Sequence, residues 1–510
     1  MHQPNIILIV LDSLRADNIL IKRNGIFLTP TLRKLKKNSY FFKNCISNNT
    51  WTLPSHNSIF SGLYSTEIKR TGKALFYINN KIPLLTEILR DNGYYTLCFT
   101  ENPWLNESMG NFRGFQSYIT NFCLKNDILT YLDKIFKYLK LKIKKFTNSI
   151  KFLSFLKLTE KVINKALKTL LKYLYWEEFV FNIRNTINEL DKLNVELKKN
   201  LENKPNYLFF NIMAPHYPYI PPKKVLEKFG INKNHIDKIR SFLLKPIKYF
   251  RNVNIRSLNL SKQQIGILNK LYDSSVYYCD LIINKLIRNL KNLGILKNSY
   301  VIITSDHGEH LCSTKDHSLY GHAIPHSVYE ELIKVPLMIY HSKFNETIIK
   351  NQVELKDLFH TILDFSRVRN DCNFFDIRNS LLYQVKNNET SKIIFGEHLK
   401  RKNEMMEIIR KSKDYLNPEL VRKILYDVYF LRTQNYKYIN YENKIEELYD
   451  LNCDLKEKSN IIEINEEISH KMKHKFNKCF TEIKNINYIN KNLMKKEKES
   501  IKRAIENLKL

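Results

Sequence analysis

Short apolar runs alternate along this chain with amphipathic helical segments, and this alternation restricts its fold more than any other feature. Helix–turn–strand patterns occupy residues 83–100 and 272–309, further strands are expected at 6–11, within 204–219 and at 335–340, and a further helix at 355–365. Strands separated by helices are typical of an α/β protein. We therefore predict a mixed, mostly parallel sheet flanked by helices.

Two parts of the chain lack this alternation of strands and helices. Residues 124–202 have a helical pattern in which basic and apolar residues are interspersed, and we interpret them as an insertion. Beyond about residue 370 the pattern changes again: two strand-like runs within 429–451 are split by a turn at Glu442-Asn443, and a charged helix follows at about 485–508. We predict a main domain at 1–370, which carries the insertion, and a smaller C-terminal α+β subdomain with an antiparallel hairpin at 371–510.

Composition and missing motifs argue against nucleotide-binding and nucleic-acid-binding proteins. The formal net charge of +32 fits either an anionic partner or a coding bias towards lysine, isoleucine and asparagine. Neither GxxxxGKS/T nor GxGxxG occurs, so a nucleotide-binding loop is not indicated. The 8 cysteines form no CxxC pair, and no nucleic-acid-binding module is evident, so no specific nucleic acid is expected. The absence of a signal peptide or transmembrane segment predicts a cytoplasmic protein.

Acidic residues follow two of the apolar strands. Asp12 comes directly after the run at 6–11, and the pair Asp306-His307 follows the strand "SYVIITSD". In an α/β sheet, ligands bind at the carboxyl ends of parallel strands. Carboxylates and an imidazole there suit a divalent cation. The alternative is that these residues only cap loops and helices, which is common after a strand.

A second unusual stretch, "NTWTLPSHNSIFSG", occupies residues 49–62. Proline suits the first helical position, so we expect Pro54 to open a short helix, with Thr52 just before its positive end. Thr52 is then either part of the helix cap or a nucleophile placed where an anion is stabilised.

These motifs, in this order, resemble the sulfatases of the alkaline phosphatase superfamily. "PNIILIVLDSLRADNI" is similar to the first strand and metal-binding Asp of that family, and "TWTLPSHNSIFSGLYSTE" to its nucleophile segment. "NIMAPHYPYIPP" resembles a substrate-facing loop, and "LGILKNSYVIITSDHGEHL" the second metal-binding segment. "LRTQNYKYI" and "EELYDLNCDLKEKSNI" resemble its C-terminal hairpin. The resemblance implies an alkaline phosphatase/sulfatase-like core and an ester hydrolase.

The nucleophile segment departs from the usual family pattern. The typical C-x-P-x-R frame, whose Cys becomes formylglycine, reads TLPSH at residues 52–56, and threonine cannot become formylglycine. The set Asp12, Thr52, Asp306 and His307 is instead similar to the metal site of phosphoryl-transferring relatives, which are membrane-anchored. The resemblance therefore implies one divalent ion, with Mn²⁺ or Zn²⁺ favoured over Mg²⁺ or Ca²⁺, and Thr52 as nucleophile.

Four further residues are candidates for contact with substrate: three at positions that the resemblance implies, and Lys315 because it lies near the Asp306-His307 pair in the sequence. We assign proton transfer or oxyanion stabilisation to His216 and His322. His56 replaces the family's Arg, and either contacts the ester or only caps. Lys315 either binds substrate charge or is a solvated surface lysine. We expect Glu309 to support the metal-binding loop without binding the ion.

These features predict a metal-dependent hydrolase that cleaves phosphate esters, diesters above all, or sulfate esters through a covalent Thr52 intermediate. Two alternatives stay open: a phosphoryl transferase acting on a lipid or glycan head group, and a non-catalytic sulfatase-like binding protein. The expected partner is an anionic small-molecule, lipid or glycan ester. The basic stretch 124–202 either contacts an anionic membrane or packs as an ordinary amphipathic helix. The sequence does not indicate the oligomeric state.

Overall fold

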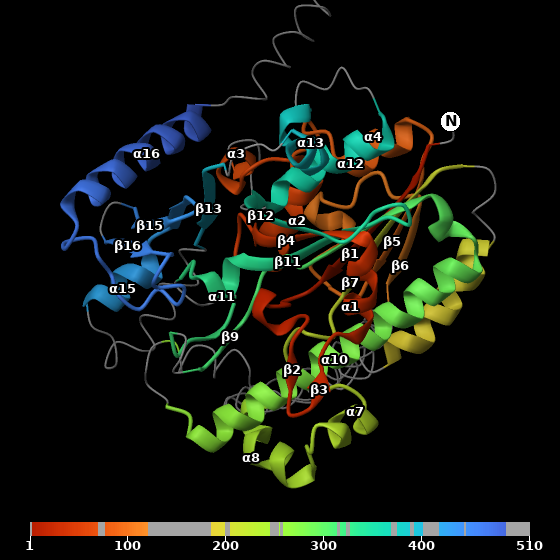
Figure 1. The fold of residues 1–510 in the computed structure, drawn as a ribbon, viewed down its shortest axis with the longest axis horizontal. Coiled ribbons are helices and arrows are strands. Elements are labelled where there is room, and N and C mark those ends of the chain that lie inside the picture. Colours follow the sequence, from red (N-terminus) through yellow and green to blue (C-terminus); the bar gives the residue numbers. More distant parts are fainter. Residues whose placement is uncertain are drawn as a thin grey trace, which may run out of the picture.

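The protein is described here from a computed structural model (Figure 1). It describes residues 3–69, 77–120, 185–198, 204–244, 254, 259–313, 317–322, 327–368, 375–387, 392–400, 418–442 and 445–485. Among these residues, no helix is both long enough and apolar enough to cross a membrane.

An eight-stranded sheet forms the centre of the molecule, in the order β12-β4-β11-β8-β1-β7-β5-β6. The central strand β1 pairs in parallel with β7 on one side and β8 on the other, and only β11 runs antiparallel to its neighbours. The predicted mixed, mostly parallel sheet is therefore confirmed. Its strands are β1 (Asn5–Leu11), β4 (Ser39–Ile46), β5 (Tyr95–Thr100), β6 (Ser117–Thr120), β7 (Asn206–Ile212), β8 (Ser299–Thr304), β11 (Lys334–Tyr340) and β12 (Thr347–Glu354).

Helices cover both faces of this sheet, because its central strand is apolar on both sides. Alternate residues of β1 belong to different cores: Ile7 and Ile9 pack with the long helix α10 (Lys262–Asn292), whereas Ile6 and Leu8 pack on the opposite face. The helices of that opposite face are α2 (Thr52–Ser61), α4 (Leu85–Asp91) and α12 (Leu358–Ser366) (Figure 1). A parallel strand buried on both sides reads as a continuous hydrophobic run, as residues 6–11 do.

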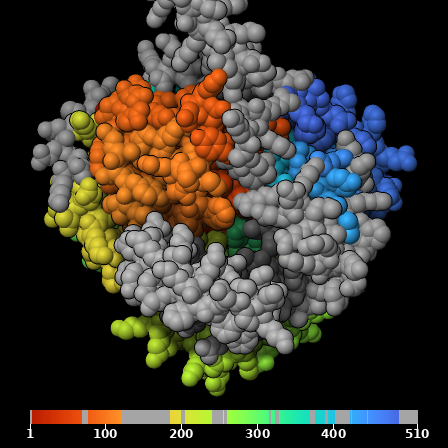
Figure 2. Space-filling view, turned by 180° about the vertical axis from the view of Figure 1, so that it is seen from behind, coloured from red at the N-terminus to blue at the C-terminus, as the bar shows by residue number. Residues whose placement is uncertain are grey.

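A separate antiparallel sheet lies at one side of the molecule and is covered by α16 (Glu466–Asn485) (Figures 1 and 2). Its strands are β13 (Ile394–His398), β14 (Val428–Arg432), β15 (Tyr436–Tyr441) and β16 (Glu446–Asp450). The predicted antiparallel hairpin is confirmed, because β15 ends at Tyr441 and pairs antiparallel with β16. The first of the two predicted strand-like runs is not one strand, however, but a hairpin of its own. The Thr433 amide donates to the carbonyl oxygen of Tyr436 at 2.8 Å, which closes a turn between β14 and β15.

Buried ion pairs connect this C-terminal sheet to the main sheet. Glu330, at the start of α11 (Glu330–Ile333), accepts two hydrogen bonds from the Arg432 guanidinium at 3.0 and 3.1 Å. Lys437 lies 2.7 Å from Glu457, and all four side chains are almost fully buried. Removing one member would leave a buried charge without a partner, so this cluster fixes the position of the C-terminal sheet relative to the main sheet.

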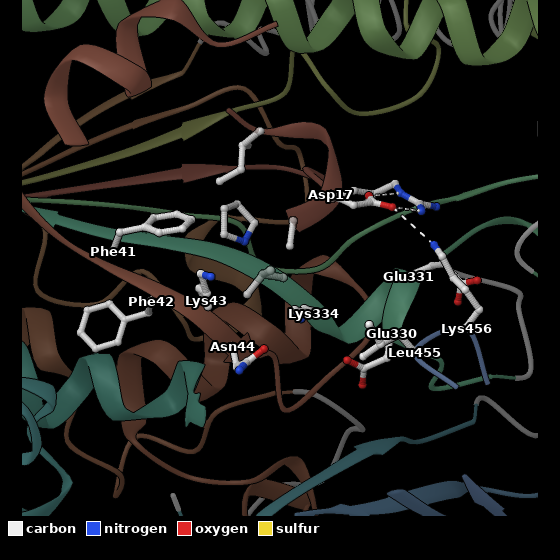
Figure 3. A pocket seen from close by; sticks show the side chains of 15 residues that line it. Asp17, Phe41, Phe42, Lys43, Asn44, Glu330, Glu331, Lys334, Leu455 and Lys456 are labelled. Atoms are coloured by element: carbon white, nitrogen blue, oxygen red, sulfur yellow. Dashed lines mark hydrogen bonds and ion pairs between the residues drawn. The ribbon is translucent and has the colours of Figure 1, made fainter. Parts of the chain in front are cut away.

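Smaller elements complete the described part of the chain. They are β2 (Lys22–Arg23), β3 (Ile26–Phe27), α1 (Pro30–Leu35), α3 (Ser65–Lys69), α7 (Lys223–Lys228), α8 (Lys233–Leu244), β9 (His310–Leu311), β10 (Tyr320–Gly321), α13 (Leu381–Lys386) and α15 (Pro418–Leu425). A pocket of about 350 Å³ lies beside β4 and β11 and is lined by charged residues that include Asp17, Lys334 and Lys456 (Figure 3).

Only the end of the predicted insertion 124–202 is described. Residues 185–198 form a helix whose Leu190, Leu193 and Leu197 are buried in the same core as α10. This segment therefore packs on the main domain, whereas membrane contact by the rest of the insertion stays a prediction. The expected charged helix at 485–508 lies outside the described residues except for Asn485, and the domain boundary near residue 370 also stays a prediction.

Gly308→Ala tests how tightly the fold holds the loop after β8. A Cβ at this position would lie 1.9 Å from the carbonyl oxygen of Glu331. The Gly308 amide also donates to the carbonyl oxygen of Leu332 at 2.7 Å, so the loop cannot move aside without losing that bond. We expect the free energy of unfolding to fall by about 1–3 kcal/mol, measured by urea denaturation.

Gly266→Ala is the matched control for this variant. Gly266 lies within α10 and has no atom within 4 Å of the added Cβ, so helix propensity alone should leave stability unchanged or raise it by about 1 kcal/mol. Equal denaturation midpoints for Gly308→Ala and the wild type would contradict the packing described here.

Candidate metal and catalytic site

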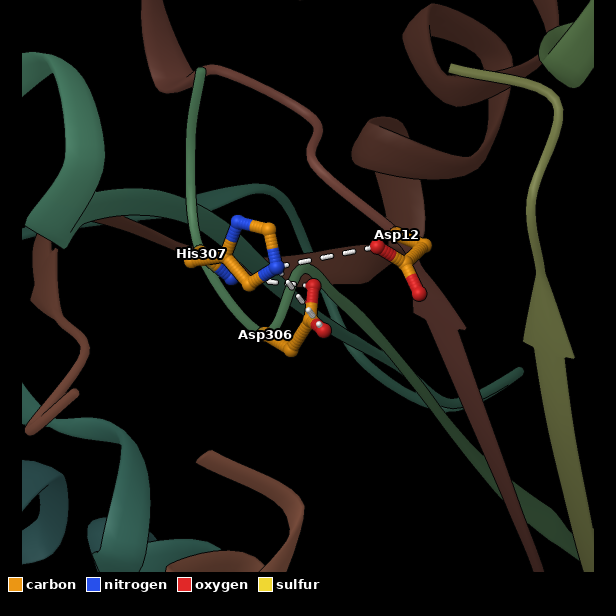
Figure 4. A group of neighbouring side chains, drawn as sticks. All are labelled: Asp12, Asp306 and His307. Atoms are coloured by element: carbon orange, nitrogen blue, oxygen red, sulfur yellow. Dashed lines mark hydrogen bonds and ion pairs between the residues drawn. The ribbon is translucent and has the colours of Figure 1, made fainter. Parts of the chain in front are cut away.

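Asp12 and Asp306 meet because they follow neighbouring parallel strands. Val10 of β1 is in register with Thr304 of β8, so both strands end at the same edge of the sheet. One ligand atom from each of Asp12, Asp306 and His307 lies within 4.8 Å of the other two, and all three side chains are fully buried (Figure 4). The structure therefore brings together three of the four predicted metal ligands.

Backbone amides fix the Asp306 carboxylate in this position. Oδ1 of Asp306 accepts from the amide of His307 at 2.9 Å and from the amide of Ser13 at 3.3 Å. Ser13 can aim its amide this way because the chain turns sharply after Asp12, with a left-handed φ of 64° at Ser13. The other oxygen, Oδ2, has no hydrogen-bond partner and is buried.

His307 is oriented so that one ring nitrogen faces the two carboxylates. Its Nδ1 lies 2.8 Å from the carbonyl oxygen of Gly308, which can only accept, so Nδ1 carries the proton. Nε2 then lies 3.4 Å from Oδ2 of Asp306 and 3.7 Å from Oδ1 of Asp12, so that in the neutral form of the ring its lone pair would face both carboxylates (Figure 4). A neutral imidazole with Nδ1 bonded to a backbone carbonyl is a common arrangement for a metal ligand.

Thr52 joins this group as the first residue of α2. Its hydroxyl lies 3.4 Å from Nε2 of His307 and 3.5 Å from Oδ2 of Asp12. The expectation that Pro54 opens the helix is wrong: α2 begins at Thr52, and Pro54 is its third residue. Proline is tolerated throughout the first turn because the amides there have no acceptor within the helix.

Burial makes the two carboxylates difficult to ionise together. Burial raises the pKa of Asp306 well above its usual value, and the nearby Asp12 carboxylate raises it further. Burial also acts to raise the pKa of Asp12, but the neighbouring histidines, His216 and His307 foremost, outweigh it and lower that pKa to about 2. In the absence of a cation, one carboxyl of the pair is therefore charged and the other is held neutral.

The donor set fits a divalent cation. It consists of two carboxylates, one of which has a buried oxygen without a hydrogen-bond partner (Oδ2 of Asp306), and an imidazole whose Nε2 faces them. A cation would give that oxygen a partner and remove the repulsion between the carboxylates. The ligand roles of these residues, including the fourth ligand Thr52, stay predictions.

Asn102 is a member of the site that the sequence analysis missed. Its Nδ2 donates to Oδ2 of Asp12 at 2.7 Å and lies 3.4 Å from the Thr52 hydroxyl. Asn211, which is in β7, donates to the same oxygen of Asp12 at 3.4 Å. Asn102 follows β5 at the carboxyl edge of the sheet, so the reasoning that found Asp12 could also have found it.

Three histidine rings lie in sequence beside the carboxylates. The ring centres of His307 and His322 are 4.3 Å apart, and those of His322 and His216 are 5.0 Å apart. Glu309 holds His322 in place, because its two carboxylate oxygens lie 3.0 and 3.1 Å from Nδ1 of His322. Glu309 thus positions His322, and its support of the metal-binding loop stays a prediction.

Of the two predicted substrate-binding residues, the structure describes only one. His56 is fully buried, and its Nδ1 donates to the carbonyl oxygen of Thr52 at 2.8 Å and lies 3.7 Å from Oδ2 of Asp306. Burial lowers the pKa of His56 to about 4, so the ring is neutral at pH 7. It therefore lies on the buried side of α2, and contact with substrate stays a prediction. Lys315 lies outside the described residues.

Comparisons with known proteins agree with this arrangement. The family model described as "Sulfatase" matches residues 4–367. An arylsulfatase of Clostridium perfringens is 22% identical over 428 residues, covering 81% of this chain and 85% of the relative. A shorter match, 29% identical over 135 residues, covers 25% of the chain and 23% of the phosphoethanolamine transferase EptA of Helicobacter pylori.

The fold is shared with solved structures at lower identity. The phosphonate monoester hydrolase of Agrobacterium radiobacter superposes with a TM-score of 0.64 at 15% identity, covering 94% of this chain and 96% of that one. The family match spans most of the chain and includes all the residues that meet at the sheet edge. The chain therefore belongs to the sulfatase family of the alkaline phosphatase superfamily, and is an ester hydrolase of the sulfatase type.

Proposed function

We propose that this chain is a metal-dependent hydrolase that prefers phosphate esters, diesters above all, to sulfate esters and forms a covalent intermediate on Thr52. One observation carries the proposal: the Thr52 hydroxyl lies 3.4 Å from His307 and 3.5 Å from Asp12, at the group formed by Asp12, Asp306 and His307. A threonine that served only as a helix cap would not need two carboxylates and an imidazole close to its hydroxyl.

Asp12, Asp306, His307 and the Thr52 hydroxyl would hold the ion. Sulfatase-family proteins are metal-dependent, and the imidazole ligand favours Mn²⁺ or Zn²⁺ over Mg²⁺ or Ca²⁺. When bound, the ion would lower the pKa of the hydroxyl and withdraw charge from an ester oxygen.

The surroundings of Thr52 prepare it for attack on an anionic ester. The hydroxyl lies at the amino end of α2, a ten-residue helix whose first amides point outward and favour negative charge. Asn102 donates towards both Asp12 and Thr52, so it fixes the carboxylate relative to the hydroxyl. The attacking oxygen is therefore oriented before substrate arrives, which lowers the entropic cost of reaching the transition state.

The preference for phosphate esters over sulfate esters follows because Thr52 has a single hydroxyl. Hydrated formylglycine has two: one attacks sulfur, and the other loses its proton and expels sulfate by cleavage of a carbon–oxygen bond. Thr52 has no second hydroxyl, so its esterified form must be released by attack of water on phosphorus or sulfur. Phosphoryl groups are transferred readily in this way when donors surround the phosphoryl oxygens.

His322 can serve as the base for that second step. Burial and the neighbouring rings of His307 and His216 lower the pKa of His322 well below its usual value, so the ring is neutral. Nδ1 of His322 faces the Glu309 carboxylate, which leaves Nε2 to accept a proton from water. Glu309 would then stabilise the imidazolium that forms. We assign the protonation of the leaving group to His216.

A transferase is the second candidate, supported by the partial match to EptA. It would use the same phospho-threonine but deliver the phosphoryl group to an alcohol rather than to water. Product analysis with and without added alcohol acceptors would separate the two reactions.

Replacing the Asp306 carboxylate should abolish metal binding. We expect Asp306→Asn to lose bound metal, because the change removes one negative charge from the group that would hold the ion. Metal content after gel filtration, by mass spectrometry, is the measurement. Asp91→Asn, which changes an exposed carboxyl at the end of α4, is the control and should keep its metal. A metal-free wild type whose melting temperature is unaffected by added Mn²⁺ or Zn²⁺ would contradict the site.

Replacing the nucleophile should remove activity and leave the fold intact. We expect Thr52→Ala to lower kcat/KM for an aryl phosphate by at least about 10³-fold, and Thr52→Cys to be slow. The wild type should have a higher kcat/KM for the aryl phosphate than for the matched aryl sulfate. The proposal fails if Thr52→Ala keeps most of its phosphatase activity, or if the wild type is faster on the sulfate.

His322→Gln should separate the two chemical steps. Without its base, the second step slows by about 10²-fold or more, whereas the first turnover still releases one equivalent of phenol. Stopped-flow measurement with an aryl phosphate should therefore show a burst followed by slow turnover. His341→Gln, which changes a buried histidine that contacts Tyr300 and Phe344, is the control. A single slow phase without a burst would contradict this assignment.

A further inference from the structure

We propose that the pocket beside β4 and β11 binds a small organic anion, which is a molecule with an apolar body and one anionic group, and that Lys43 and Lys334 hold the anionic group. The pocket has a volume of about 350 Å³, which lies within the range of small-molecule sites. Neither Thr52 nor any of the proposed metal ligands lines it. The site is therefore separate from the catalytic group, and the inference does not depend on the proposed function.

A β-bulge in the main sheet forms part of the wall of this pocket. Lys43 and Asn44 of β4 together lie opposite the single residue Pro336 of β11. Proline has no amide to donate to the neighbouring strand, so the ladder of hydrogen bonds is interrupted here. A bulge changes the direction of the side chains beside it. Lys43 lines the pocket together with Lys334, the first residue of β11 (Figure 3).

These two lysines have no ion pair with another residue in the part of the chain that the structure describes. Lys43 is exposed and Lys334 is half-buried. Burial lowers the pKa of Lys334 from its usual value, and the nearby positive charge of Lys43 also lowers it, whereas Glu330 acts in the opposite direction. An anion beside the two ammonium groups would offset both the burial and the repulsion between them.

The carboxylates around the pocket, in contrast, already have partners. Each of the three that line it has a basic side chain close by: Asp17 has Arg15 at 2.7 Å, Glu330 has Arg432 at 3.0 Å and Glu331 has His317 at 3.1 Å. Lys456, at the edge of the pocket, lies 3.6 Å from Asp17 and adds a further positive charge. The charge left for a ligand is therefore positive, which favours an anion.

Apolar side chains make up much of the remaining lining. Ile19 and Pro336 are buried, Phe41 is half-buried, and Leu455, in the loop after β16, is 58% exposed. In the view of Figure 3 the two lysines lie between Phe41 and the ion pairs around Asp17. An apolar ring or chain joined to the anionic group would remove this surface from water, whereas an inorganic anion would leave it exposed.

A fluorescent probe of this chemical class tests the site. Anilinonaphthalene sulfonate joins an apolar body to one anionic group, it is not an ester, and phenylnaphthylamine is its uncharged parent. Fluorescence titration of the full chain with each probe is the measurement. We expect Lys334→Gln to weaken binding of the sulfonate by about tenfold or more, and that of the uncharged parent by about twofold or less. Lys334→Arg keeps the charge and should bind the sulfonate within about threefold of the wild type.

Two further variants separate the pocket from the rest of the surface. Lys43→Gln should weaken binding of the sulfonate in the same direction as Lys334→Gln. Lys343→Gln is the matched control, because Lys343 is an exposed lysine that follows the opposite end of β11, and it should leave both affinities unchanged. The melting temperature of Lys334→Gln should be no lower than that of the wild type, because burial disfavours the charge that this change removes.

Competition with the bound sulfonate then identifies the anionic group. Benzoate, benzenesulfonate and phenylphosphonate differ in that group alone, so their order of displacement ranks carboxylate, sulfonate and phosphonate. Inorganic phosphate lacks the apolar body and should displace the probe at least about tenfold less well than phenylphosphonate. Equal displacement by these two would overturn the assignment of an apolar body.

Three results would overturn the site itself. They are the absence of saturable binding of the sulfonate to the wild type, binding of the sulfonate that Lys334→Gln leaves unchanged, and equal weakening of the sulfonate and its uncharged parent. None of these measurements involves hydrolysis, so failure of the proposed function would leave their outcome unaffected.

Discussion

The repulsion between two buried carboxylates, Asp12 and Asp306, is the constraint on which the rest of this structure depends. Neighbouring parallel strands force the two groups to the same edge of the sheet, away from water. Such a pair is unfavourable unless a cation or a proton lies between the charges. The amides that hold Asp306, the orientation of His307 and the amide of Asn102 all act on this pair. We therefore regard the cost of burying the charges as the origin of the proposed metal requirement.

The surrounding fold places Thr52 and the amino end of a helix beside these carboxylates. Helix α2 begins at Thr52, so the hydroxyl and the amino end of the helix face the carboxylates together. The loop after β8 cannot relax, because Gly308 packs against the backbone of Glu331. The C-terminal sheet supports the same region from outside, through Phe395 behind Trp51. Thr52, the two carboxylates and Trp51 thus lie in one continuously packed region.

Much of this arrangement could be predicted from sequence because local signals coincide with the fold. Asp12 and Asp306 end strongly apolar strands, and strand ends in a parallel sheet converge, so their proximity followed from pattern alone. The start of α2 was misjudged because Pro54 is compatible with several positions in a first helical turn. Asn102 was missed because a lone asparagine after a strand is usually only a turn residue. The edge-to-face packing of Trp51 on Trp104, with ring centres 6.4 Å apart, depends on contact between segments distant in the sequence, which periodicity does not report.

The most direct test of the central claim is to look for the phosphoryl group itself. The protein, loaded with Mn²⁺ or Zn²⁺, would be mixed with an aryl phosphate, quenched in acid within milliseconds, digested and analysed by mass spectrometry. The account predicts a phosphorylated peptide with the modification on Thr52, present only during turnover. Rapid turnover with no phosphorylated peptide, or with the phosphoryl group on another residue, would contradict it.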